Sequence, residues 1–154
     1  MIREATQQDF NSVASLACNV HDMHITARSD LFKNEHFYTQ DFFEDSLQDD
    51  SKKIFVFEES GNILGYCATY TRDYNNHIAF YDTKILTIES IGVCENARGK
   101  GIGRQLFGRA KAYAKEIGAT RVELNVWAFN KNAKEFYEHL GFTEKSSTME
   151  MKIT

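Results

Sequence analysis

Three glycines and three basic residues lie together in the segment Arg98-Gly99-Lys100-Gly101-Ile102-Gly103-Arg104. Glycines at alternate positions leave the backbone unobstructed, so that successive N–H groups can point into one concavity. A long helix is expected directly after this segment, and its free N–H groups and positive dipole end would further attract an anion. The segment is therefore expected to bind a phosphate or pyrophosphate group, with a flexible, ligand-free strand–helix connection as the alternative.

Two better-known phosphate loops do not fit this segment. A Walker loop requires Ser or Thr after its Gly-Lys pair, whereas Gly101 follows Lys100. The dinucleotide fingerprint requires a third glycine three residues after the second, and Arg104 or Leu106 stands there. A nucleotide site of either kind is therefore disfavoured.

A second patterned segment runs from Asn130 to Phe142 and reads N-x-x-A-x-x-F-Y-x-x-x-G-F. Together the two segments resemble the GNAT superfamily of acetyl-CoA-dependent N-acetyltransferases. Arg98, Gly101 and Gly103 occupy the fixed places of that family's Q/R-x-x-G-x-G/A pyrophosphate signature. The resemblance is strong from residue 88 to 142 and extends to the first 80 residues only in general pattern.

The resemblance implies roles for several residues. Backbone groups of Ile91 and Val93 would hold the pantetheine arm and the acetyl carbonyl, with the Val93 N–H facing the developing oxyanion. The pyrophosphate would lie on residues 98–104. Tyr137 would be the general acid that protonates the departing thiolate, although its helical spacing also suits a core residue. Asn130 is expected to be a helix N-cap, a contact to the cofactor arm, or both.

A general base for the amine is less clearly marked in the sequence. With strand alternation, Glu89 would share a face with Ile91 and Val93 and could reach the amine directly or through water. A bulge in that strand would change this face assignment. Glu123 and Asn125 are weaker alternatives, and related enzymes also use a water chain without a dedicated base.

The stretch from residue 21 to 33 is expected to line the acceptor side. It begins a group of histidines and acids that could suggest a metal site, namely His21, Asp22, His24, Asp30 and His36. His21 and His24 could share a helical face, but no third clustered ligand is evident. We therefore expect no metal.

Composition limits the class of protein. The chain has 154 residues, of which 42% are hydrophobic and 13% aromatic, which suits one globular domain spanning 1–154. No apolar run approaches the roughly 20 residues of a membrane span, and the first residues do not resemble a secretory signal. Three widely spaced cysteines (Cys18, Cys67 and Cys94) favour a reduced, cytoplasmic protein over a disulfide framework or zinc site.

Charge is distributed unevenly along the chain. The net charge of −4 argues against a nucleic-acid partner. Residues 1–60 carry twelve acidic and five basic residues, whereas residues 61–154 carry ten acidic and thirteen basic ones. An anionic ligand is therefore expected on the later part and a cationic one on the earlier part, unless the asymmetry is only that of a solvated surface.

The predicted elements alternate between helices and strands. Hydrophobic spacing, caps and turn residues predict strands at 2–5, 53–57, 63–70, 85–93, 122–126 and 148–153, and helices at 9–20, after Thr39, at 102–117 and after Asn130. Residues 21–38 are irregular in pattern and 72–77 form a polar loop. The fold class is therefore α/β (mixed α+β). The resemblance implies a GNAT-like, mostly antiparallel twisted sheet flanked by helices, with splayed strands holding the cofactor.

These expectations define one function and one alternative. The chain would transfer acetyl from acetyl-CoA to a primary amine by direct attack in a ternary complex. The acidic first part favours a cationic acceptor such as a polyamine, an aminoglycoside-like compound, an amino-acid derivative or a lysine-bearing peptide. The alternative is a non-catalytic acyl-CoA sensor. A homodimer is compatible with either, and neither a metal nor a membrane is expected.

Overall fold

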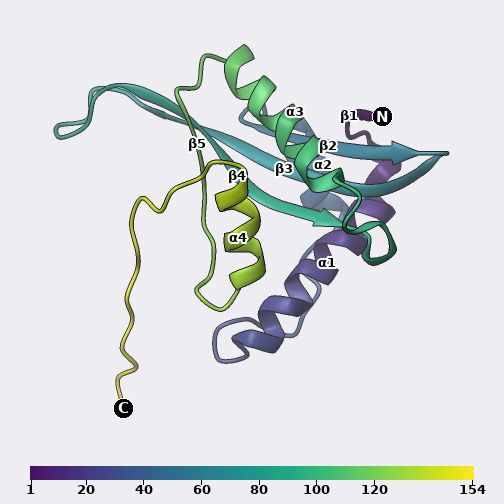
Figure 1. The fold of residues 1–154 in the computed structure, drawn as a ribbon, viewed down its shortest axis with the longest axis horizontal. Coiled ribbons are helices and arrows are strands. Elements are labelled where there is room, and N and C mark those ends of the chain that lie inside the picture. The colour runs from purple at the N-terminus through teal and green to yellow at the C-terminus, as the bar shows by residue number, and fades with distance from the viewer.

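The computed structural model describes residues 1–154 and contains one sheet of five strands in the order β1-β2-β3-β4-β5 (Figure 1). The strands are β1 (Ile2–Glu4), β2 (Lys52–Glu59), β3 (Asn62–Tyr74), β4 (Thr83–Val93) and β5 (Arg121–Leu124). All neighbouring strands are antiparallel except β4 and β5, which are parallel. The mixed, mostly antiparallel sheet predicted from the sequence is therefore confirmed.

Helices cover the two faces of this sheet. Helices α1 (Phe10–Ala27) and α2 (Gln40–Gln48) pack on one face, where a buried cluster includes Val13, Phe43, Val56 and Tyr66. Helix α3 (Ile102–Glu116) packs on the other face over a second cluster that includes Phe55, Cys67, Leu86 and Leu106. Neighbouring residues in β2 and β3 enter opposite clusters because successive strand side chains point to opposite faces. Helix α4 (Lys131–His139) follows β5.

Three predicted helix ends are confirmed by local hydrogen bonds and turns, whereas β3 continues to Tyr74 through residues predicted to begin the polar loop 72–77. The Thr39 hydroxyl accepts the Phe42 N–H at 3.2 Å, which caps α2 as expected. Gly118 and Gly141 follow α3 and α4 with φ of 74° and 101°, the left-handed conformation that ends a helix.

The first helix is longer than predicted. The structure continues α1 to Ala27 through residues that the sequence pattern left irregular. The side chains of His24 and Thr26 bond to the carbonyls of Val20 and Asp22, four residues earlier. His21 and His24 therefore lie on a helix. The last turns of α1 lack an apolar stripe because their side chains border a pocket and do not pack in the core.

The last predicted strand, 148–153, is wrong. Residues 143–154 form neither helix nor strand, and Figure 1 shows this segment leaving α4 as an extended tail. Its alternating Met149, Met151 and Ile153 are exposed. A strand requires a neighbour for its backbone groups, and none pairs with this segment. Strand β5 also ends at Leu124, before Val126.

No helix in the structure has the length and the hydrophobicity required to cross a bilayer.

Candidate active site

Strands β4 and β5 separate part-way along their length. They pair from Ile85 opposite Arg121 to Ile88 opposite Leu124, and beyond that point β4 continues to Val93 without β5 beside it. The resemblance implied splayed strands, and β4 and β5 are splayed in this way. It leaves one edge of β4 free over residues 89–93.

The free edge of β4 presents donors. The Cys94 N–H donates to the Leu64 carbonyl of β3 at 2.8 Å. Because successive N–H groups along a strand point to opposite edges, those of Val93 and Ile91 point away from β3 and into the gap. These are the two backbone positions that the resemblance to the GNAT family assigns to the acetyl and pantetheine groups.

The glycine-rich segment follows directly. Gly99 and Gly101 both have φ of 78°, a conformation that glycine adopts without strain. No backbone or side-chain oxygen accepts from the N–H groups of residues 99–104, and α3 has no side-chain N-cap. The Ile102 side chain is buried in the core, so only its backbone is available to a ligand.

Positive charge surrounds these free donors. Arg98, Lys100 and Arg104 are exposed, and none of them forms an ion pair. The Arg98 Nε–H donates to the Val93 carbonyl at 3.4 Å, which joins the segment to the end of β4. Free N–H groups and unpaired cations at a helix N-terminus fit a pyrophosphate.

The second patterned segment packs against the first. A Cβ on Gly103 would lie 3.2 Å from Phe136 Cζ, so glycine lets α4 approach the start of α3 closely. The Asn130 side chain accepts the Ala133 N–H at 3.1 Å, which confirms it as the N-cap of α4. Next to Phe136, the Tyr137 ring packs edge-to-face on Phe136 and Phe142.

Tyr137 is directed at the sheet near the gap. Burial and the neighbouring Cys67 raise the pKa of the Tyr137 phenol above its usual value, and Cys67 lies opposite Ile91 across β3 and β4. The Tyr137 hydroxyl forms no hydrogen bond with the protein. It is therefore a protonated donor without a protein acceptor, close to Cys67 of β3.

Glu89 lies in a bulge, and its predicted face is wrong. Ala68 pairs with Ser90 and Thr69 pairs with Ile88, so Glu89 between them has no partner on β3. The extra residue shifts the alternation, and Glu89 and Ser90 line the same pocket on the α1–α2 side. Ile91 packs on the α3 side instead.

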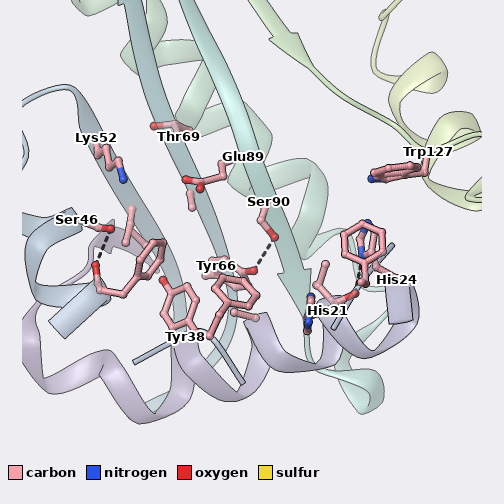
Figure 2. A pocket seen from close by; sticks show the side chains of 17 residues that line it. His21, His24, Tyr38, Ser46, Lys52, Tyr66, Thr69, Glu89, Ser90 and Trp127 are labelled. Atoms are coloured by element: carbon pink, nitrogen blue, oxygen red, sulfur yellow. Dashed lines mark hydrogen bonds between the residues drawn. The ribbon is translucent and has the colours of Figure 1, made fainter. Parts of the chain in front are cut away.

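This pocket has a volume of about 240 Å³ and is formed by α1, α2, the strands β2 to β4 and Trp127 (Figure 2). The Tyr66 and Ser90 hydroxyls are 2.6 Å apart within it. Burial and the charge of Glu89 raise the pKa of Tyr38 to about 12. Tyr38, Tyr66 and Trp127 carry no local sequence signal, because only the fold brings them into the same pocket as Glu89.

Other candidates are placed elsewhere. His21 and His24 line the pocket, and each has a ring nitrogen bonded to a backbone carbonyl. His36 instead contacts Cys18 Sγ at 3.2 Å. Glu123 is bound by Lys145, and Asn125 does not line the pocket. The structure contains no group of three His, Cys, Asp or Glu side chains suited to a metal ion.

Comparison with known proteins decides the family. The model of the acetyltransferase (GNAT) family matches residues 19–142. The chain belongs to the GNAT family of acetyltransferases. An uncharacterized N-acetyltransferase of Methanocaldococcus jannaschii is 38% identical over 104 residues, which are 68% of this chain and 45% of that protein. The chain thus spans about half the length of this relative and of one from Chlorobaculum tepidum.

Solved structures share the GNAT fold along the whole chain. A tetramutant of the BH1408 protein of Bacillus halodurans is 34% identical, with a TM-score of 0.95 over 99% of both chains. The aminoglycoside N-acetyltransferase AAC(6')-Iy, solved in complex with CoA, has a TM-score of 0.75 at 18% identity, covering 100% of this chain and 99% of that one. The second likeness shows the fold alone.

Proposed function

We propose that the chain transfers an acetyl group from acetyl-CoA to a primary amine by direct attack within a ternary complex. The observation that carries this proposal is the bulge at Glu89. It makes consecutive residues of β4 serve two sites: Glu89 and Ser90 face the pocket, whereas the Ile91 N–H faces the gap beside β5. An amine in the pocket and a thioester in the gap would therefore meet at one point of the strand.

The cofactor side would use the donors already described. The N–H groups of residues 99–104, with Arg98, Lys100 and Arg104, would hold the pyrophosphate. Ile91 and Val93 would hold the pantetheine arm, and Val93 would donate to the carbonyl oxygen as negative charge develops there. Asn130 keeps its amide N–H₂ free for the arm while its oxygen caps α4.

Tyr137 would protonate the departing thiolate. A general acid must be protonated at the working pH, which a phenol already is near neutral pH, and burial raises the pKa of Tyr137 further. Its lack of a protein acceptor leaves the proton available to a ligand in the gap.

Glu89 would accept the proton of the attacking amine, directly or through water. It is exposed toward the pocket, and no cation pairs with it in the protein. An ammonium group cannot attack a carbonyl, so a nearby carboxylate would both attract the cationic amine and remove its proton. No dedicated metal is part of this chemistry.

The organisation of the whole protein belongs to the same proposal. Residues 1–154 would act as one acetyltransferase domain, supported by the single sheet. A cytoplasmic location is supported by three free cysteines. A homodimer is supported by the alternating exposed side chains of Met149, Met151 and Ile153.

The test combines acetyl-CoA thermal shift with a thiol-release assay over a panel of primary amines. Stabilisation by acetyl-CoA and release of CoA with an amine would establish the transferase. Stabilisation without release from any amine would favour the acyl-CoA sensor. Absence of stabilisation by acetyl-CoA or longer acyl-CoA thioesters would contradict the pyrophosphate assignment itself.

A further inference from the structure

The pocket that reaches Glu89 has an aromatic wall and little charge. Ten of its seventeen lining residues are hydrophobic. On one side the Phe32 ring meets Trp127 at 5.2 Å and 71° and meets His24 at 5.2 Å and 62°. These edge-to-face pairs leave flat and edge surfaces that suit another aromatic ring.

Glu89 is the only acidic residue that lines the pocket, and Lys52 is the only basic one apart from the histidines. Figure 2 shows Lys52 and Trp127 on opposite sides of Glu89. The Lys52 ammonium lies 5.5 Å from the Phe42 ring, so it faces the apolar wall. A polyamine or aminoglycoside carries several cations, of which only one could pair with Glu89, and any other cation held inside the pocket would lack a counter-charge. The pocket supplies one carboxylate and adds a cation of its own.

The volume gives a third constraint. About 240 Å³ lies below the roughly 300–1,000 Å³ of pockets that hold drug-sized ligands. The volume therefore favours a small ligand. The acidic residues of the segment 1–60 do not line the pocket, because its only carboxylate is that of Glu89 in β4.

We infer that the acceptor is a small arylalkylamine: one primary amine, held at Glu89, on a single aromatic body that packs against Phe32 and Trp127. This inference rests on the proposed acetyl transfer, since it names the amine for that same site. In the reaction, the amine nitrogen bonds to the acetyl carbon and the carbon–sulfur bond breaks. Glu89 takes the proton from nitrogen, and Tyr137 gives one to the thiolate.

Trp127 offers a readout that does not depend on catalysis. It is the only tryptophan of the chain and is 38% exposed. An aromatic body packed against Trp127 would remove its indole from water, so titration with 2-phenylethylamine should produce a saturable shift of the emission. Spermidine and kanamycin should produce none. Phe32→Ala should weaken 2-phenylethylamine binding about tenfold, the equivalent of about 1.4 kcal/mol.

The matched control is Phe80→Ala, which removes an exposed phenylalanine of the β3–β4 connection outside the pocket and should leave binding unchanged. Glu89→Gln should abolish the preference for 2-phenylethylamine over 2-phenylethanol. Emission shifts without acetylation of 2-phenylethylamine or of any other primary amine would support the pocket inference and contradict the proposed transfer. Acetylation of spermidine or kanamycin at a higher kcat/KM than 2-phenylethylamine would overturn the inference and leave the transfer intact. An unchanged emission at saturating arylalkylamine would also overturn it.

Discussion

The ring of Tyr66 occupies the space that a side chain at Gly92 would need. A Cβ placed on Gly92 would lie 2.5 Å from Tyr66 Cε1, closer than any real contact. The same Tyr66 bonds to Ser90 through its hydroxyl at 2.6 Å. One buried tyrosine of β3 thus fixes two residues of β4, immediately after the bulge that presents Glu89.

Replacing Gly92 with Ala should therefore destabilise the protein. Tyr66 is 1% exposed and cannot move outward, so the added methyl group should cost about 1–3 kcal/mol as overpacking. Urea unfolding would measure the change. Gly108→Ala is the control: Gly108 lies within α3 with nothing within 4 Å of its Cβ position, and alanine there should stabilise by about 0.5–1 kcal/mol. Equal stability of the two variants would contradict the role given to Tyr66.

Replacing Tyr137 with Phe should lower kcat by roughly 10²–10⁴-fold, the usual contribution of a general acid. The ring would keep its packing on Phe136 and Phe142, so acetyl-CoA affinity and unfolding temperature should change little. Tyr113→Phe is the matched control, because Tyr113 packs on Phe55 away from the gap. Steady-state kinetics would decide, and a kcat within twofold of wild type for Tyr137→Phe would remove Tyr137 from the mechanism.

The glycine-rich segment and the start of α4 could be predicted from the sequence because their signals are local. Glycine spacing, adjacent bases and the N-cap Asn130 lie within short segments, and the free N–H groups appear where these predict them. The splay of β4 and β5 was implied by the family resemblance. The face of Glu89 could not be predicted, because a bulge is a property of the pairing between β3 and β4. The aromatic wall of the pocket could not be predicted either, because Phe32 and Trp127 are far apart in sequence and come into contact only through the fold.

Replacing Gly101 with Ala should weaken acetyl-CoA binding as well as the fold. A left-handed φ of 78° costs a non-glycine residue about 1–2 kcal/mol, and residue 101 lies within the run of free N–H groups from residue 99 to residue 104. Gly118→Ala is a close control, with φ of 74° and open space at the end of α3. Both variants should lose similar stability, but only Gly101→Ala should raise the Kd for acetyl-CoA, by about tenfold. Isothermal titration of the two variants would compare them, and equal affinities would argue against a pyrophosphate on this segment.

Asp9 should make the fold sensitive to acid. Its carboxylate is almost fully buried and accepts two N–H groups of Arg3, at 2.8 and 3.0 Å, and the Thr6 N–H at 2.8 Å. The hydrogen bonds from Arg3 hold the pKa of Asp9 below its usual value. A lowered folded-state pKa means that the stabilisation is complete above the unfolded pKa of about 3.9. It is lost as the pH falls through the folded-state pKa.

Asp9→Asn should therefore lose about 2–4 kcal/mol of unfolding free energy at neutral pH, because Arg3 then loses its buried partner. The variant should also show a weaker fall in stability between pH 5 and strongly acidic conditions, in about the range where Asp9 takes up its proton. Glu4→Gln is the control, since the exposed Glu4–Lys53 pair contributes about 0–1 kcal/mol. Urea unfolding across this pH range would measure both effects. A pH profile for Asp9→Asn that runs parallel to wild type would show that another carboxylate controls the acid transition.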